Sequence, residues 1–343
     1  MKIAFFDTKS YDSSAFSRCS ENTGIEYTFF ETRLSPKTAS LAAGFDGVCV
    51  FVNDTVDATV IDTLYRGGVR FIALRCAGYN NVDIGHAFGK IHVFHVPAYS
   101  PHAVAEHAMA LLLTSVRRTH KAYARTKEFN FSLQDLVGFD LHGKTVGIIG
   151  TGKIGRVFAD ICLGFGMRVL GYDKYPAPNS PVAYTDLDTL FRESDVVSLH
   201  CPLTDETHHL ICRERIETMK KGVVIVNTSR GALIDASALL WGIKERIVGA
   251  ACLDVYEEET EYFFEDRSSH ILEDDTLARL ISMPNVILTS HQGFLTREAL
   301  DAIAETTTRN LLSYEKEGFC ENELCYRCGK TEICKGKNRG KCF

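Results

Sequence analysis

The architecture of this 343-residue chain can be inferred from Val146-Gly147-Ile148-Ile149-Gly150-Thr151-Gly152-Lys153-Ile154-Gly155. The apolar first part predicts a buried strand, and the last three glycines have the spacing G-x-G-x-x-G. In a dinucleotide-binding turn, Gly150 permits the tight turn, Gly152 lets the backbone approach a pyrophosphate, and Gly155 lets helix and strand pack closely. The start of the next helix offers free N–H groups to the phosphates. The stretch therefore predicts a strand, a phosphate-binding turn and a helix.

An acidic residue, Asp173, ends the next apolar run, about twenty residues after the glycines. A carboxylate at this position accepts hydrogen bonds from the adenosine ribose and repels a 2′-phosphate, so the sequence favours NAD over NADP. Two alternatives stay open. Asp173 can be an ordinary turn residue at a strand end, and the neighbouring Lys174 leaves an opening for NADP.

Short apolar runs alternate with helix-length segments throughout the chain, which predicts parallel sheets built from βαβ units. Five strands are expected in the first part, at 3–6, 27–30, 48–52, 71–74 and 92–96. Six more follow Lys144, at 146–149, 169–172, 196–199, 223–226, 248–253 and 286–289. Six strands are typical of a dinucleotide-binding domain.

Ser100 and Pro101 are suited to the first positions of a helix, as N-cap and first helical residue. We expect one long helix from Val104 to about Arg125 and another from Thr296 to about Glu315, the second returning the chain to the first domain. The predicted domains are 1–100 plus 297–324 (substrate and catalytic domain), 101–296 (NAD-binding Rossmann domain) and 325–343 (a cysteine-rich, basic C-terminal extension).

Composition narrows the possible partners. The net charge of −6 disfavours nucleic acid and anionic membranes, which both attract basic surfaces. No apolar stretch approaches the roughly 18–20 residues that span a bilayer, and the N-terminal apolar run ends at Asp7. We therefore expect a cytoplasmic protein. Seven of its twelve cysteines are scattered, mostly in apolar runs, and are expected to be buried, reduced thiols.

Polar residues follow five successive strands of the second block, where ligands bind in an open parallel sheet. After Asp173 come His200-Cys201-Pro202, Asn227-Thr228-Ser229-Arg230-Gly231, Asp254 and Ser290-His291. Reduction of a keto acid by NADH needs a cation for the carboxylate and a proton donor for the oxygen. Arg230 and His291 can supply them from different strands.

A carboxylate beside the histidine would orient it and stabilise its protonated form. Spacing alone leaves four candidates open: Glu257, Glu258, Glu259 and Glu261. His200 competes with His291 because it also ends a strand, and Arg230 can instead cap the next helix.

From Lys2 to about Leu324 the sequence resembles the D-isomer-specific 2-hydroxyacid dehydrogenases, and among them the fermentative bacterial D-lactate dehydrogenases. The segments that show the resemblance are Ala73–Asp83, Val96–Pro101, Ala105–Ala108, Gly150–Gly155, Ser198–Thr204, Val226–Asp235, Leu253–Glu257 and Thr289–Gln292. The resemblance implies an α/β protein with two doubly wound parallel-sheet domains, one flavodoxin-like and catalytic, the other a Rossmann NAD-binding domain. It also implies reversible reduction of pyruvate to D-lactate, and a homo-oligomer, dimer or tetramer.

The same resemblance implies residue roles. Arg230 matches the carboxylate-binding arginine, His291 the proton donor and Glu259 its carboxylate partner. The implied cofactor contacts are Gly150, Gly152, Lys153, Ile154, Gly155, Asp173, Cys201, Pro202, Thr207, Thr228, Ser229 and Asp254. The implied substrate contacts, besides Arg230 and His291, are Ala77, Gly78, Tyr99 and Phe294, with Phe51 nearby. No metal ion is expected among them. Large aromatic side chains there suit a small substrate such as pyruvate.

The resemblance stops near Leu324. The remaining residues are basic and contain Cys325, Cys328, Cys334 and Cys342, which permits a zinc site, a redox-sensitive tail or a disordered extension. Two rival functions stay open: a dehydrogenase for another 2-keto acid such as phenylpyruvate or hydroxypyruvate, and an NADH-sensing protein that shares the fold.

Overall fold

The computed structural model describes residues 1–178, 180–259, 262–318 and 320–325. The chain forms two compact units, Met1–Ser100 with Thr296–Phe343, and Pro101–Leu295. The extension predicted at 325–343 lies outside the described residues except for Cys325.

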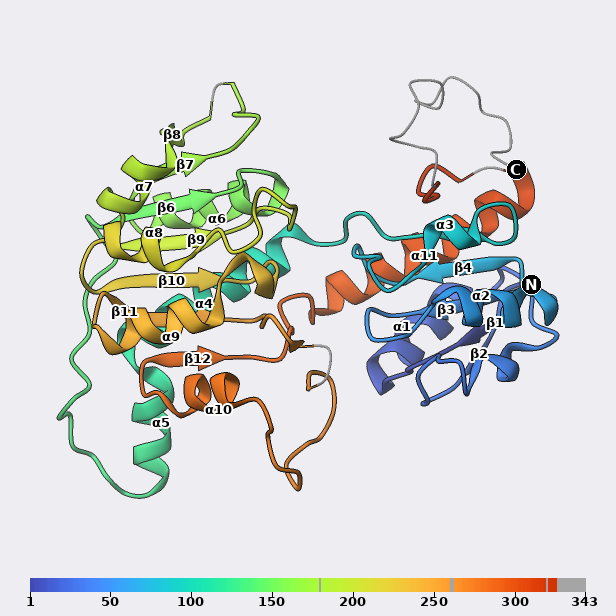
Figure 1. Ribbon diagram of the computed structural model, residues 1–343, viewed down its shortest axis with the longest axis horizontal. Coiled ribbons are helices and arrows are strands. Elements are labelled where there is room, and N and C mark those ends of the chain that lie inside the picture. Colours follow the sequence, from blue (N-terminus) through green and yellow to red (C-terminus); the bar gives the residue numbers. More distant parts are fainter. Residues whose placement is uncertain (179, 260–261, 319, 326–343) are drawn as a thin grey trace. The chain divides into compact units, whose positions relative to one another are not determined.

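The first unit contains a five-stranded parallel sheet in the order β2-β1-β3-β4-β5 (Figure 1). This 2-1-3-4-5 order is that of flavodoxin-like domains, as predicted. The strands are β1 (Lys2–Phe5), β2 (Glu26–Phe29), β3 (Gly47–Val50), β4 (Phe71–Leu74) and β5 (His92–Phe94). The helices are α1 (Ser10–Ser20), η1 (Ala39–Ala42), α2 (Ala58–Arg66), α3 (Ile84–Ala87) and α11 (Arg297–Glu317). α11 packs on α1, β4 and β5, so the C-terminal helix belongs to the N-terminal unit.

The second unit contains a seven-stranded parallel sheet in the order β12-β11-β10-β9-β6-β7-β8. Its strands are β6 (Thr145–Ile149), β7 (Arg168–Tyr172), β8 (Ala183–Tyr184), β9 (Val196–Leu199), β10 (Val223–Asn227), β11 (Val248–Leu253) and β12 (Val286–Leu288). Its helices are α4 (Pro101–Arg117), α5 (Thr119–Lys127), α6 (Lys153–Gly164), α7 (Leu187–Glu193), α8 (Arg213–Thr218), η2 (Gly231–Leu233), α9 (Ala236–Lys244) and α10 (Asp275–Ser282). The order is that of a Rossmann sheet with one strand added, and it confirms the predicted fold class.

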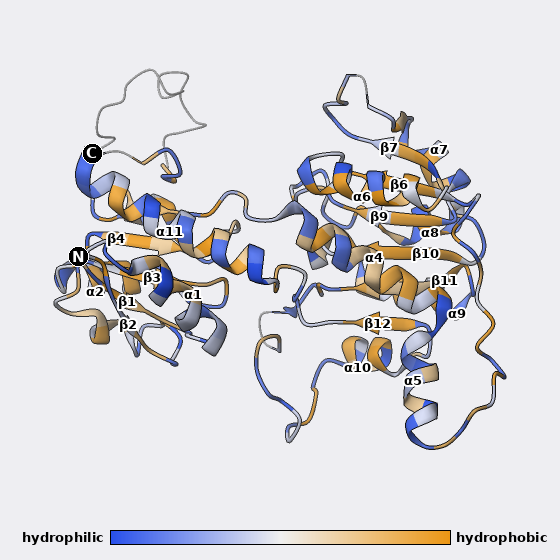
Figure 2. Ribbon diagram, turned by 180° about the vertical axis from the view of Figure 1, so that it is seen from behind, coloured by the Kyte–Doolittle hydropathy of each residue, from blue (hydrophilic) through white to orange (hydrophobic). Residues whose placement is uncertain are grey.

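Both faces of this sheet are buried, which explains why its strands are continuous apolar runs (Figure 2). In β10, Val224 and Val226 face a core shared with α4 and α6. Val223 and Ile225 face the other core, shared with α8, α9 and α10. The strand reversal between β6 and β9 opens the crevice in which such sheets bind ligands.

Two sequence predictions for this unit were wrong. The long helix expected from Val104 to Arg125 is broken at Arg118, whose φ of 51° is left-handed. α4 has an apolar buried side, whereas α5 has no buried residue, so no packing favours a straight continuation. The backbone of Gly138 also lies against the carbonyl of Val116 at the end of α4. The seventh strand, β8, was missed because two residues show no periodicity.

Five of the seven scattered cysteines are buried, while Cys19 and Cys212 are half-buried. In the described part of the chain, none of the helices has the length and apolar character needed to cross a bilayer. The cytoplasmic location stays a prediction.

Candidate active site

The glycine turn joins β6 to α6 at the strand reversal. Gly150 has a φ of +91°, and a Cβ on it would lie 2.5 Å from the amide nitrogen of Cys201. A Cβ on Gly155 would lie 2.0 Å from the carbonyl oxygen of Gly150. Open space surrounds the Cβ position of Gly152, directly before the first helical residue Lys153. Of the three glycines, Gly152 is therefore the one beside which the turn leaves room for a ligand.

Asp173 lies beside this turn. Its Oδ2 accepts the backbone N–H of Thr151 at 2.6 Å, and its Oδ1 accepts that of Tyr175 at 2.8 Å. These bonds fix the carboxylate at the end of β7. The exposed Lys174 is paired with Glu206, 3.0 Å from Nζ to Oε2.

One hydrogen bond joins the segments after β9 and β10, and a second lies within the segment after β9. The Ser229 hydroxyl donates to the Cys201 carbonyl at 2.8 Å, and the Thr207 hydroxyl donates to the Pro202 carbonyl at 2.7 Å. The Thr228 hydroxyl is buried and has no hydrogen-bond partner among the described residues. A buried hydroxyl without a partner is costly, and a bound ligand would satisfy it. Together with the open Gly152 and the fixed carboxylate of Asp173, these residues fit a dinucleotide.

His291 and Glu259 form a close pair. Nδ1 of His291 lies 2.7 Å from Oε1 of Glu259, whose Oε2 accepts the N–H of Tyr256 at 3.0 Å. His291 has a left-handed φ of 54°, and its N–H donates to the Asp254 carbonyl. The ring of Phe264, which sequence reasoning did not identify, lies 5.9 Å from the imidazole.

Among the described candidate carboxylates, Glu259 is the one paired with His291. Glu257 contacts His209, and Glu258 is exposed. Glu261 lies outside the described residues.

The loop with His291 is held by Asp254, a buried residue. Its carboxylate accepts the N–H groups of Gln292 and Gly293 at 2.9 and 2.7 Å. Burial alone would raise the pKa of Asp254, but hydrogen bonds from His107 and Thr289 bring the pKa below its ordinary value. Sequence reasoning missed this positioning role of His107, although His107 lies in one of the motifs that show the resemblance.

Arg230 follows β10, directly before η2. Its side chain is half-buried and donates to the carbonyl of Ser229 at 2.7 Å. A Cβ on the next residue, Gly231, would lie 2.0 Å from the carbonyl carbon of Tyr256. The Arg230 turn therefore touches the loop that contains Glu259. The next α-helix, α9, is capped by Asp235, so Arg230 is not needed as its cap.

The competing histidine, His200, is partly buried. Its Nε2 lies 2.8 Å from the Ser198 hydroxyl, and its ring packs 4.9 Å from Phe158. Burial lowers the pKa of His200 to about 3, so the imidazole is neutral at ordinary pH. This environment suits packing beneath the glycine turn better than proton donation.

The predicted substrate contacts Ala77, Gly78 and Tyr99 belong to the first unit, whereas Phe294 is buried in the second. Ala77 and Gly78 follow β4, where the Ala77 carbonyl lies 3.0 Å from Nδ1 of His95. The guanidinium of the preceding Arg75 lies 4.6 Å from the ring centres of both Phe5 and Phe51.

Known proteins resemble this chain over nearly its whole length. Residues 109–293 match the family described as D-isomer specific 2-hydroxyacid dehydrogenase, NAD binding domain. The D-lactate dehydrogenase of Escherichia coli is 50% identical over 94% of this chain and 100% of its own. The structure of the pyruvate reductase of Chlamydomonas reinhardtii has a TM-score of 0.90 at 40% identity, covering 94% of this chain and 98% of its own.

A third structure, D-lactate dehydrogenase with NAD⁺ from Lactobacillus jensenii, has a TM-score of 0.80 at 29% identity. It covers 94% of this chain and 99% of its own. These matches confirm the predicted resemblance. The chain belongs to the D-isomer-specific 2-hydroxyacid dehydrogenase family, and its second unit includes that family's NAD-binding domain.

Proposed function

We propose that this protein is a D-lactate dehydrogenase that reversibly reduces pyruvate to D-lactate with NADH. The main support is the His291–Glu259 pair, which places an oriented imidazole at the carboxyl end of the sheet that also bears the glycine turn. Relatives named D-lactate dehydrogenase and pyruvate reductase support the choice of substrate.

NAD is the proposed cofactor. The turn residues Gly150, Gly152, Lys153, Ile154 and Gly155 hold the pyrophosphate, and Asp173 holds the adenosine ribose. The remaining proposed contacts are Cys201, Pro202, Thr207, Thr228, Ser229 and Asp254. A negative charge at Asp173 disfavours the 2′-phosphate of NADP. When bound, the nicotinamide supplies the hydride for the keto carbon.

The side chains of the chain provide the remaining chemistry. Arg230 binds the carboxylate of pyruvate and stabilises negative charge on the keto oxygen. His291 donates a proton to that oxygen from Nε2, because Nδ1 is bound to Glu259. Glu259 keeps the ring in this orientation, with Nδ1 toward its carboxylate. In lactate oxidation the same imidazole accepts the proton.

The substrate's own contacts follow from the resemblance. Backbone amides at Ala77 and Gly78 bind its carboxylate, and Tyr99 and Phe294 lie near its methyl group, with Phe51 nearby. No metal ion takes part in these steps.

The test uses His291→Ala and Arg230→Ala, with His270→Ala, an exposed histidine, as the matched control. Removing a general acid or a charge-stabilising group costs about 10²–10⁴-fold in rate. We expect that loss in kcat/KM for pyruvate in both variants, with NADH binding retained. Turnover close to that of the control would refute the assigned roles.

A panel of pyruvate, phenylpyruvate, a branched keto acid and hydroxypyruvate, followed by NADH absorbance, tests the substrate. Pyruvate should have the highest kcat/KM. A higher value for another keto acid would assign a different dehydrogenase, and NADH binding without turnover of any would favour a sensing protein.

We also propose a homo-oligomer. The segment between α5 and β6 exposes several large apolar side chains, including Phe129 (84%), Phe131 (72%) and Val137 (85%). Exposed apolar clusters of this kind are typical of subunit interfaces. Sedimentation should show a dimer or tetramer that dissociates when Phe129 and Phe131 are both replaced by Asp. A monomeric parent protein would contradict the proposal.

A further inference from the structure

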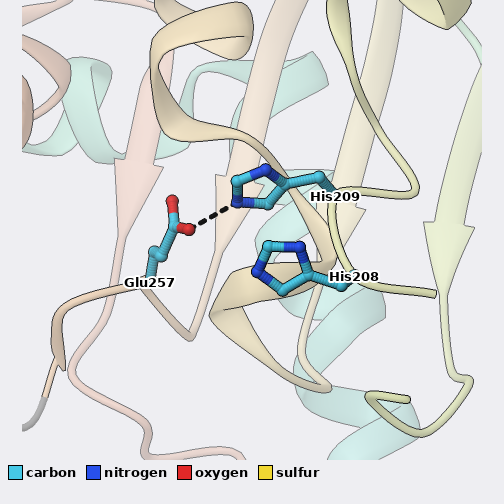
Figure 3. Close-up of side chains that lie close together, drawn as sticks. All are labelled: His208, His209 and Glu257. Atoms are coloured by element: carbon cyan, nitrogen blue, oxygen red, sulfur yellow. Dashed lines mark hydrogen bonds and ion pairs between the residues drawn. The ribbon is translucent and has the colours of Figure 1, made fainter. Parts of the chain in front are cut away.

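Three potential ligand side chains meet beside the proposed active site. His208 and His209 lie in the segment after β9, and Glu257 lies in the loop after β11 (Figure 3). Their ligand atoms all lie within 4.8 Å of one another. Nε2 of His209 is 2.5 Å from Oε1 of Glu257. None of the three is among the catalytic, cofactor-binding or substrate-binding residues assigned above.

The backbone holds both sides of this cluster in place. His209 has a left-handed φ of 49°, which is unfavourable for a non-glycine residue. Its N–H donates to the Ala232 carbonyl at 2.8 Å, and that of Ile211 to the Leu233 carbonyl at 2.9 Å. On the other side, Gly231 packs directly against the backbone of Tyr256 and Glu257. The separation of the histidines from Glu257 is therefore set by main-chain contacts.

A simple ion pair explains only part of the arrangement. It accounts for His209 and Glu257 but not for His208, whose ring lies 3.9 Å from that of His209 with an interplanar angle of 25°. His208 is exposed, and its side chain has no hydrogen-bond partner among the described residues. Figure 3 shows ring nitrogens of both histidines directed toward the Glu257 side.

We propose that His208, His209 and Glu257 form a binding site for a divalent transition-metal ion of the Zn²⁺ type. Two imidazole nitrogens and one carboxylate oxygen are ligands that such ions prefer, with water completing a tetrahedron. Ligand atoms about 2.0–2.2 Å from a tetrahedral ion lie roughly 3.3–3.6 Å apart. The site therefore closes when the exposed His208 ring rotates and the His209–Glu257 pair, now 2.5 Å apart, opens by about 1 Å. The ion takes the place of the proton between His209 and Glu257, and that proton moves to Nδ1 or to solvent.

A bound ion would connect the segment after β9 to the loop that leads into Glu259. It binds the folded chain and not the unfolded one, so it raises the thermal midpoint as its concentration rises. The proposal does not depend on the proposed reaction.

The test uses the full chain, freed of metal with a chelator and titrated with Co²⁺, whose visible spectrum reports its ligands. We expect one equivalent bound with d–d bands and without a thiolate charge-transfer band, which separates this site from the C-terminal cysteines. His208→Ala and Glu257→Gln should each weaken binding at least about tenfold, since each removes one of three ligands. The matched controls are His270→Ala and Glu273→Gln, two exposed residues outside the cluster.

A second readout separates metal binding from folding. Zn²⁺ should raise the thermal midpoint of the parent protein and of His291→Ala, but not that of His208→Ala, whose exposed side chain is not needed for the fold. Unchanged Co²⁺ affinity in His208→Ala and Glu257→Gln, or a thiolate band at the first equivalent, would overturn the proposal. Loss of the site in His291→Ala would show instead that the ion binds the catalytic pair.

Discussion

Nδ1 of His291 lies 2.7 Å from Oε1 of Glu259, and the other oxygen of Glu259 accepts the backbone N–H of Tyr256. The carboxylate is thus fixed by its own loop before it orients the imidazole. This double contact distinguishes Glu259 from the neighbouring acidic residues Glu257 and Glu258.

Glu259→Gln keeps the size of the side chain and removes its charge. We expect kcat for pyruvate reduction to fall roughly 10–100-fold, because residues that orient a functional histidine have effects of this size. NADH affinity should stay within about twofold of the parent value. Glu258→Gln, a change at the exposed neighbour, is the control, and equal kcat values in the two variants would contradict the role of Glu259.

Thr228→Val tests the buried hydroxyl that has no partner among the described residues. Valine has the same shape, so the free enzyme should be equally stable or up to about 1 kcal/mol more stable to urea. If the hydroxyl binds the dinucleotide, the dissociation constant for NADH rises severalfold. An unchanged constant, measured by protein fluorescence, would assign Thr228 to packing alone.

Glu206→Gln tests the choice between NADH and NADPH. The ammonium of Lys174 is paired with Glu206 and adjoins Asp173, so both carboxylates oppose a 2′-phosphate. Because the pair is exposed, its effect is modest, and we expect kcat/KM for NADPH to rise about two- to fivefold. NADH kinetics should not change. Glu193→Gln breaks another exposed pair, with Arg168, and should leave NADPH use at the parent level.

The pH dependence of stability should reveal His200. Burial lowers the pKa of its imidazole to about 3 in the folded protein, whereas the ordinary pKa of histidine is 6.5. Between pH 6.5 and 3, His200 is protonated in the unfolded chain but stays neutral in the folded one. The free energy of unfolding therefore decreases as pH falls over this range, by up to about 1.4 kcal/mol per pH unit. In urea unfolding, His200→Gln should lose less stability over this range than the parent. Parallel losses in the two proteins would show that His200 is not the cause.

Much of the fold could be predicted because buried parallel strands leave a direct trace in the sequence. The run 223–226 is apolar at every position since both faces of β10 are covered. The break between α4 and α5 at Arg118 could not be predicted in this way, because the residues of α5 are compatible with a helix whether or not it continues α4. It depends on tertiary contacts such as that of Gly138 with Val116.

The sequence could predict which strand ends carry the candidate residues, but not which side chains contact one another. Strand-end positions pointed to Arg230 and His291 as candidates, but spacing could not choose among four glutamates. The choice of Glu259 came from the resemblance, and the contact with His291 depends on how the loop after β11 folds. The contact of His107 with Asp254 joins residues 147 positions apart in the sequence, so no local sequence pattern could predict it.

The close approach of Gly231 to Tyr256 has a practical consequence for anyone who wishes to redesign the specificity of this chain. Main chain meets main chain there, so the spacing between the Arg230 turn and the Glu259 loop is independent of side-chain identity elsewhere. Mutational libraries at the proposed substrate contacts Tyr99 and Phe294 should therefore keep position 231 as glycine. New substrates should be reachable without rebuilding the proton-transfer apparatus.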